Sequence, residues 1–355
     1  MKKLIPEILA VLLIFTGCIE ADSPAENIPD STFSALRSDD PENIAEPVKT
    51  AAESPFNGLP EEEIDMNFSP LVNKKSFDHQ LFCYDGEGNI YFANPADNLY
   101  LYVYDGKDCR AAAEIPVCGL GYDGGYVYFL SGKAVNIEDD IGPSGYPYRY
   151  DPRTGETEKL GEAQTECLTV IDGELYGLNF EAACCAYKYD SGERLFNSFY
   201  IQKTGDYFLN CRPEGNGIAF YLENGDISHL FITEDIPRNP VFSYGKCFYI
   251  DQNTNELKSV NLTDGSVNVY CSGGIGDFTL MGGDLYIIDS DQFLCRYDEG
   301  KLSRLNDVRQ FESLYSDNEH LYGIGKEYSA VSGRMEYFFV KLGDDFSAEI
   351  IGRRE

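Results

Sequence analysis

The residues best suited to chemistry in this sequence gather between positions 131 and 148. Three consecutive carboxylates, Glu138, Asp139 and Asp140, are followed by a Gly-Pro pair and then by Tyr146 and Tyr148, which flank a further proline. Carboxylates suit a cationic group, a calcium ion or sugar hydroxyls, and a tyrosine ring offers a flat face for stacking. The prolines restrict the backbone and so lower the entropy lost on binding. We predict a ligand-binding loop here, with a surface insertion without function as the alternative.

Two further stretches offer similar side chains. Phe180 and Glu181 follow an apolar run, and Tyr328 and Arg334 flank a stretch of small and polar residues. An exposed tyrosine also covers apolar surface while its hydroxyl stays hydrated, so these residues have a structural explanation as well. We predict that all four contribute to ligand binding from loops.

Signatures of familiar catalysts are missing. The chain has no Gly-x-Ser-x-Gly, no His-Glu-x-x-His and no phosphate-binding Gly-Lys-Ser or Gly-Lys-Thr loop. None of the three histidines, His79, His229 and His320, has a partner that can be named, and we interpret them as structural or surface residues. The stretch from Asp251 to Glu256 resembles a calcium loop but lacks its glycine, so a strand-connecting turn is expected. We predict no cofactor, with calcium as a weak alternative.

Charge and cysteine content narrow the choice of partners. The formal net charge is -32, which disfavours nucleic acid and anionic membrane surfaces as partners. Eleven cysteines occur, but most lie singly within strand-like runs, where cysteine behaves as a small buried hydrophobe. We expect mainly free thiols, although the adjacent pair Cys184-Cys185 is also compatible with redox activity. We expect a monomer.

A short repeated phrase shows which elements position these residues. Each copy is a tight turn followed by an alternating apolar strand, and the centres of the copies are 29 to 48 residues apart: Tyr91, Tyr128, Tyr176, Ala219, Phe248, Tyr286 and Tyr322. This period is typical of a four-stranded propeller blade. The sequence therefore predicts an all-β, seven-bladed β-propeller over residues 64–355, with six or eight blades as alternatives. The copy at Ala219 is the weakest, because its fourth strand would fall in Glu234 to Asn239, where Pro237 is unfavourable. Its blade is predicted to have three strands, or to receive more of Arg194 to Cys211, of which Arg194 to Ile201 is assigned to the fourth strand of the preceding blade.

Turn lengths distinguish the two faces of such a ring. Because blade strands alternate in direction, second-to-third connections share a face with the connections between blades. Three second-to-third connections are long in our assignment, Ser131 to Tyr146, Asn179 to Cys185 and Ile324 to Arg334, whereas the turns of the other face are short, as in Asp151 to Gly155. Long loops on a rigid scaffold usually carry binding, so we predict that the ligand contacts this face.

The repeat resembles that of exported bacterial β-propellers related to the prolyl-oligopeptidase propeller, including a family of unknown function. Phrases such as Asn89-Ile90-Tyr91-Phe92 carry this likeness, and the Tyr-Asp-Pro-x-Thr-Gly turn at residues 150–155 is similar to turns of kelch and quinoprotein propellers. The resemblance covers residues 76–351 and implies the propeller fold only. Since the chain has no tryptophan, it lacks the WD dipeptide and the docking signature of quinoproteins. The hydrolase domain of prolyl oligopeptidases has no room in this chain.

The first 63 residues predict export and tethering. Residues 1–17 combine two lysines with an apolar run too short to span a bilayer, which is typical of a signal peptide. The ending Phe15-Thr16-Gly17-Cys18 resembles a lipobox, which implies lipid attachment at Cys18 after cleavage. Residues 18–63 are acidic and proline-rich, so we expect a disordered tether. The predicted location is the outer face of a bacterial cell membrane.

Two functional hypotheses follow. The first is a surface-tethered module that binds or scaffolds a protein or carbohydrate ligand, supported by the tether, the missing catalytic motifs and the loop asymmetry. The alternative is a carbohydrate-active lyase or hydrolase, because such enzymes on propellers use carboxylate or tyrosine chemistry in place of histidine.

Overall fold

The computed structural model describes residues 81–352, apart from 132–144, 166, 172, 180–184, 198–199, 205–206, 215–216, 225, 234, 236, 244, 262–264, 299, 306–309 and 318. In this part of the chain all regular secondary structure is β-strand, and no helix is long and apolar enough to cross a membrane. The predicted all-β propeller is confirmed. The proposed signal peptide, lipidation site and tether lie outside the described residues.

The described strands form seven four-stranded antiparallel sheets, each built from strands that are consecutive in the sequence. The first three sheets comprise β1 (Phe82–Tyr84), β2 (Ile90–Asn94), β3 (Tyr100–Tyr104), β4 (Cys109–Pro116); β5 (Cys118–Asp123), β6 (Tyr126–Ser131), β7 (Tyr146–Asp151), β8 (Glu156–Lys159); β9 (Cys167–Ile171), β10 (Glu174–Asn179), β11 (Cys185–Lys188) and β12 (Arg194–Asn197). The fourth and fifth comprise β13 (Tyr200–Thr204), β14 (Tyr207–Glu214), β15 (Gly217–Asn224), β16 (Asp226–Thr233); β17 (Pro237–Ser243), β18 (Lys246–Asp251), β19 (Leu257–Asn261) and β20 (Val267–Cys271). The last two comprise β21 (Asp277–Met281), β22 (Asp284–Ile288), β23 (Leu294–Asp298), β24 (Lys301–Arg304); β25 (Gln310–Ser316), β26 (Leu321–Ser329), β27 (Arg334–Leu342) and β28 (Ala348–Ile351).

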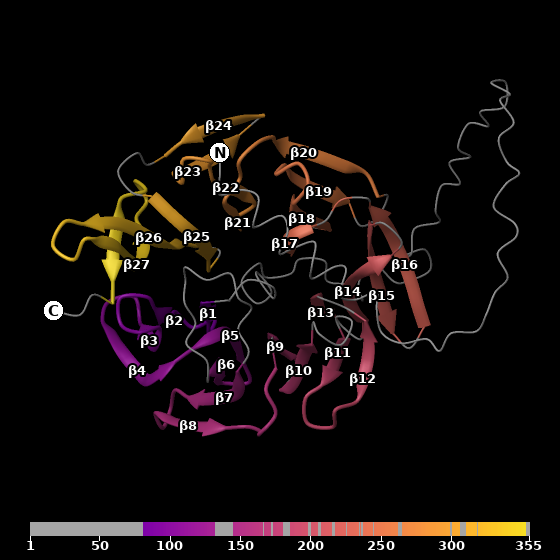
Figure 1. The fold of residues 1–355 in the computed structure, drawn as a ribbon, viewed down its shortest axis with the longest axis horizontal. Helices are drawn as coiled ribbons and strands as arrows, with labels where there is room; N and C mark the ends of the chain where they lie inside the picture. The colour runs from indigo at the N-terminus through magenta and orange to yellow at the C-terminus, as the bar shows by residue number, and fades with distance from the viewer. Residues whose placement is uncertain are drawn as a thin grey trace, which may run out of the picture.

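The sheets stand in a ring, with their first strands innermost and their fourth strands at the rim (Figure 1). Successive sheets contact one another through first strands, as β1 does with β5, β5 with β9 and β21 with β25. All four residues of the fourth strand β24 are exposed, and two of them, Lys301 and Arg304, are charged. The second strands are apolar because both of their faces are covered by neighbouring sheets, as in β2 and β22.

The short turns on one face have the chemistry that the sequence indicates. Gly173 and Gly283 precede second strands with φ values of 78° and 89°, a region that favours glycine. In the turn from β7 to β8, the amide of Gly155 donates to the carbonyl of Asp151 at 2.8 Å, and Gly155 has a φ of 74°. These turns therefore hold consecutive strands in register without strain.

The fourth sheet differs from the sequence interpretation. Ala219 lies in β15, the third strand, whereas the other six repeat centres lie in second strands. The second strand is β14, and the first strand, β13, begins at Tyr200, within the stretch that the sequence pattern assigns to the fourth strand of the preceding blade. The sheet has four strands, and Pro237 begins the next sheet instead of ending this one. The sequence pattern took the third strand for the second, because consecutive strands of an antiparallel sheet can have the same alternation of apolar and polar residues.

The two ends of the ring meet through a shared aromatic core. Phe82 of β1 stacks on Phe339 of β27 with ring centroids 5.9 Å apart, and Phe92 of β2 stacks on the same ring at 4.2 Å. The side-chain amide of Asn94 donates to the carbonyl of Gly352 at 2.6 Å. Because these residues are more than 240 positions apart in the sequence, side-chain packing closes the ring, and within the described residues no strand is exchanged between its ends.

Candidate functional site

The start of each inner strand lies on the face that carries the second-to-third connections. Contacts between neighbouring segments show this directly: the amide of Phe311, at the start of β25, donates to the carbonyl of Gln292, in the turn between β22 and β23. The side chain of Gln310 reaches the carbonyl of Asp291 in the same turn. We call this side of the ring the connection face, defined by the turns between second and third strands and the links between sheets.

Six of the residues that the sequence nominates fall outside the described part of the chain. They are Cys18, Glu138, Asp139, Asp140, Phe180 and Glu181. Of the strands on either side, β6 ends at Ser131 and β7 begins at Tyr146, while β10 ends at Asn179 and β11 begins at Cys185. These strand ends lie on the connection face.

Tyr146 and Tyr148 occupy strand β7 and not a loop. The ammonium of Lys159 lies 4.0 Å from the centroid of the Tyr146 ring, and the Tyr148 ring stacks on Phe129 at 5.7 Å. One face of each ring is thus occupied within the sheet. Residues two positions apart in a strand point to the same side of a sheet, so Tyr146 and Tyr148 share one side of theirs. The neighbouring strands cover both rings in part, and the two tyrosines therefore do not form an open aromatic platform.

The expected loop from Ile324 to Arg334 is instead an extension of two strands, so this part of our interpretation is wrong. β26 continues to Ser329 and β27 begins at Arg334, leaving a short turn between them. The last pairing between β25 and β26 joins Gln310 to Lys326, whereas β26 and β27 stay paired as far as Ser329 and Arg334. The hairpin tip, residues 327–336, therefore projects beyond the inner strand of its own sheet.

The hairpin tip presents apolar side chains to solvent. Tyr328 is 64% exposed and Val331 is 100% exposed. Tyr328 pairs across the hairpin with Met335, and Glu327 pairs with Glu336. Directly opposed residues have close side chains, so the tip combines an apolar pair with two carboxylates. Arg334 is exposed beside the turn.

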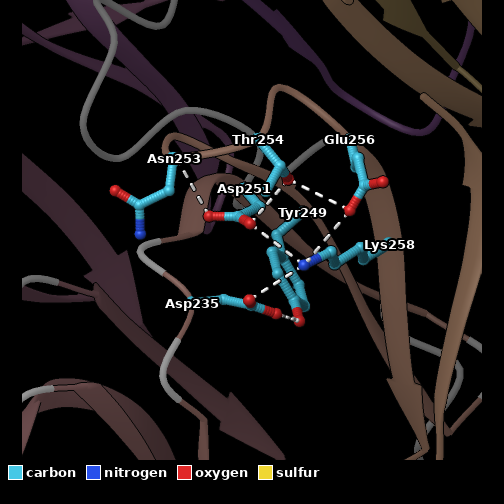
Figure 2. A network of polar contacts seen from close by, with 7 residues as sticks. All are labelled: Asp235, Tyr249, Asp251, Asn253, Thr254, Glu256 and Lys258. Atoms are coloured by element: carbon cyan, nitrogen blue, oxygen red, sulfur yellow. Dashed lines mark hydrogen bonds and ion pairs between the residues drawn. The ribbon is translucent and has the colours of Figure 1, made fainter. Parts of the chain in front are cut away.

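A buried lysine organises the connection face of the fifth sheet (Figure 2). The Nζ atom of Lys258 lies 2.8 Å from Asp235, 3.0 Å from Asp251 and 3.5 Å from Glu256. Asp235 belongs to the link between β16 and β17, whereas Asp251 and Glu256 flank the turn between β18 and β19. The Tyr249 hydroxyl donates to Asp235 at 2.6 Å. These contacts therefore hold the link between β16 and β17, which joins two sheets, against the turn between β18 and β19 of the fifth sheet.

The segment from Asp251 to Glu256 is the expected strand-connecting turn. The Asn255 amide donates to the carbonyl of Asp251 at 2.7 Å, and the Thr254 hydroxyl donates to the Asp251 carboxylate at 2.7 Å. The ammonium of Lys258 occupies the place beside these carboxylates that a cation would take. Among the described residues, no group of three or more His, Cys, Asp or Glu side chains is arranged to hold a metal ion.

Charge pairing sets the titration behaviour of this network. Burial acts to raise the pKa of Asp251, but the hydrogen bonds from Thr254 and Lys258 outweigh it, so the pKa lies below its usual value. Burial likewise acts to lower the pKa of Lys258, and the bonds to Asp235 and Asp251 reverse the effect and raise it. Both groups are charged at neutral pH.

A second polar cluster links the inner strands of the last three sheets. Arg238 of β17 donates through Nη2 to the carbonyl of Ile275 at 2.9 Å, and the Asn239 side-chain amide donates to Asp277 Oδ1 at 3.2 Å. Asp277 of β21 accepts from the amide of Leu314 in β25 at 2.8 Å through its other oxygen. Thr279 lies two residues further along β21 and shares a side of the strand with Asp277. We call Arg238, Asn239, Asp277 and Thr279 the β17–β21 junction.

Sequence reasoning missed both polar clusters. Lys258 is separated from Asp251 by seven positions, a spacing that places two residues close together only once the hairpin register is known. The junction joins residues about forty positions apart, and only the ring brings them together. One feature of the sequence could have pointed to the junction. Arg238 and Asn239 stand between two prolines, and a basic residue in such a place is conspicuous in a strongly acidic chain.

The remaining reactive groups have structural surroundings. His320 lies 3.3 Å from Asp317, which also accepts from the Tyr322 hydroxyl at 2.9 Å. Six described cysteines are free thiols, in line with expectation: Cys83, Cys109, Cys118, Cys247, Cys271 and Cys295. Burial raises the pKa of Cys118 to about 12 and that of Cys109 to about 11. These two thiols are therefore protonated at neutral pH.

Comparison with known proteins supports the fold. Puromycin hydrolase matches 81% of this chain with a TM-score of 0.54 and 13% identity. The propeller domain of the trilobed protease from Pyrococcus furiosus matches 78% with a TM-score of 0.50 and 13% identity, and 99% of that domain is covered. Acylaminoacyl peptidase of Pyrococcus horikoshii matches 75% of the chain with a TM-score of 0.50 and 11% identity.

These neighbours show that the chain has a β-propeller fold, and they show no more than the fold. The chain spans 56% of puromycin hydrolase and 51% of the acylaminoacyl peptidase. No family model matches the sequence, and no curated protein matches it.

Proposed function

We propose that the protein is a tethered extracytoplasmic propeller that binds a protein partner through the hairpin tip. One observation carries this proposal: residues 327–336 project beyond the inner strand of their sheet and expose Tyr328 and Val331. Exposed aromatic and aliphatic side chains on a rigid hairpin suit an interface, because little entropy is lost when they are buried. A ring of seven blades, one for each sheet, supplies the rigid support.

Charge selects the kind of partner. The chain has a formal net charge of -32, and Glu327 and Glu336 flank the apolar tip. A partner with basic groups around an apolar patch would be attracted from a distance and would complement both features. An acidic partner would be repelled over the same range.

The proposal includes a cellular location, the outer surface of the membrane. A lipid at Cys18 would hold the chain at the outer surface of the membrane, and residues 19–63 would act as a self-repelling spacer that places the propeller on the order of 40 Å or more from it. Support comes from the short apolar run, the small residues before Cys18 and the proline-rich acidic composition. The connection face would then be free to meet other proteins of the cell envelope.

The test is capture from solubilised envelope with the propeller as bait, using two double variants. Tyr328→Ser with Val331→Ser removes the apolar tip, and Val267→Ser with Val269→Ser removes two exposed apolar side chains of β20, which are 48% and 54% exposed. We expect a captured protein to be lost with the first pair and kept with the second, with unchanged melting temperatures for both. Equal capture by all three baits would refute the role of the hairpin tip.

A further inference from the structure

The fourth strand of the fifth sheet, β20, differs from the other fourth strands at the rim of the ring (Figure 1). Such a strand has one edge without a neighbouring strand, and proteins protect these edges with charged side chains. The other six fourth strands each contain at least one charged residue: Arg110, Glu158, Arg194, Asp226, Arg304 and Glu349. β20 contains none, and no charged residue occurs from Gly265 to Gly276. Its edge therefore lacks the usual protection.

Two valines give this edge an exposed apolar surface. Val267 and Val269 are 48% and 54% exposed, and they share one side of the sheet because they are two positions apart in a strand. The next residue, Tyr270, packs instead against the rings of Phe248 and Tyr297, with centroids 5.7 and 5.3 Å away. Valine favours strands, so an uncharged edge with exposed valines suits pairing with a further strand.

The register of β19 and β20 shows which backbone groups point to this edge. The amide of Asn261 donates to the carbonyl of Ser266 at 2.9 Å, and the pairing continues without a shift as far as Val269. Hydrogen-bonded pairs alternate with non-hydrogen-bonded pairs in an antiparallel ladder. The N–H and C=O groups of Asn268 therefore point towards β19, and those of Val267 and Val269 point outward. Within the described part of the chain, β20 pairs with β19 alone.

We propose that β20 pairs antiparallel with β20 of a second copy of this chain, about a two-fold axis at Asn268. Val267 then lies opposite Val269 of the second copy, each such pair exchanges backbone hydrogen bonds, and four valine side chains lie together. The segment Val-Asn-Val is the same in both directions, so the edge is its own complement, as a two-fold interface requires. Registers centred on either valine would instead place Val267 opposite Cys271 or Val269 opposite Gly265.

Charge favours a second copy as the occupant of this edge. Residues 265–276 offer no charge with which a strand of opposite charge could pair. The net charge of -32 repels two copies at long range, so the association is weak and strengthens as salt screens the repulsion. The monomer expected from the sequence is then the state at low concentration. This contact is independent of the hairpin tip, which belongs to the seventh sheet.

Sedimentation equilibrium of the full chain tests the association. In about 0.5 M NaCl the dimer should have a dissociation constant on the order of 100 µM, and in about 0.05 M NaCl a constant at least threefold higher. Val269→Lys should weaken dimerisation at least tenfold, because a lysine protects the edge. The matched control is Leu302→Lys on β24, which adds the same charge at a residue that is 41% exposed and should change the constant less than twofold. Both variants should melt like the natural chain, since both side chains are exposed.

Disulfide trapping tests the register. The two Asn268 residues would form a non-hydrogen-bonded pair with Cα atoms about 4.5 Å apart, which a disulfide can bridge. Asn268→Cys should therefore give a disulfide between copies at position 268 on treatment with oxidised glutathione, as identified by mass spectrometry of the linked peptides. Val267→Cys, which would face Val269 of the second copy, should give at least fivefold less of its own linked peptide.

Four results would overturn the proposal. They are a natural chain that stays monomeric at about 300 µM in high salt, association that weakens as salt is added, equal effects of Val269→Lys and Leu302→Lys, and equal trapping at positions 267 and 268.

Discussion

Replacing Lys258 by methionine should destabilise the propeller strongly. The change removes the only ammonium that contacts Asp251 among the described residues, and Asp251 is 1% exposed. Breaking a buried ion pair by removing one partner costs about 3–5 kcal/mol, because the remaining charge stays buried without compensation. Asp235 and Glu256 are partly exposed and can rehydrate, so we take the lower end, about 3 kcal/mol.

This cost translates into a melting shift. For a domain of this size, 1 kcal/mol corresponds to about 2–4 °C, so Lys258→Met should lower the melting temperature by about 6–12 °C. Lys258→Arg keeps the charge and should lower it less. A matched surface control is Lys188→Met, whose ion pair with Glu174 has side chains that are 37% and 56% exposed and should contribute less than about 1 kcal/mol.

The pH dependence gives an independent check. In the natural chain the pKa of Asp251 is lowered by folding, so this carboxylate contributes stability above its unfolded pKa of about 3.9, and that contribution is lost as the pH falls through the folded value. In Lys258→Met the effect of burial is less opposed, and the pKa of Asp251 rises. The variant can then relieve its penalty by protonation, so the gap in melting temperature should narrow from pH 7 towards pH 4.

Calorimetric scans of the natural chain and the three variants at several pH values would measure both effects. A double-mutant cycle that combines Lys258→Met with Asp251→Asn measures the coupling free energy between the two side chains. The amide that replaces the carboxylate leaves no buried negative charge at position 251 for Lys258 to neutralise. A loss below about 1 kcal/mol for Lys258→Met at pH 7, or a gap that stays constant down to pH 4, would refute the reasoning.

Three further predictions address other parts of the chain. A chain that begins at Asp65 should melt within about 2 °C of the mature protein, because residues 19–63 cannot form a core; a larger drop in a thermal scan would show that they pack on the propeller. Cys18→Ala should abolish labelling by a fatty-acid probe and move the protein from the membrane to the soluble fraction; unchanged label and fractionation would exclude lipidation there. Since burial raises the pKa of Cys109 and of Cys271 to about 11, iodoacetamide at pH 8 should modify both slowly in the folded chain and rapidly in denaturant, as followed by mass spectrometry. Equal rates in the two states would contradict their burial.

The sequence by itself determined the β-propeller class and most strand positions. Six repeat centres lie in second strands because such strands are buried on both faces and must be apolar, which leaves a periodic record in the residues. The Asp-Gly turns left a similar record, because only a few residues tolerate a positive φ. The prediction that Ala219 lies in a second strand was wrong, since an alternating pattern indicates a strand without indicating its position in the sheet.

Tertiary structure alone decided the polar clusters and the exposed surfaces. Lys258 contacts Asp235 across the link between two sheets, and Asn239 contacts Asp277 from one sheet to the next. Such contacts depend on hairpin register and on the spacing of sheets around the ring, neither of which has a local sequence signal. Tyr146 and Tyr328 illustrate the point: both are tyrosines near turn residues, yet neighbouring strands and Lys159 cover one, while an extended hairpin exposes the other.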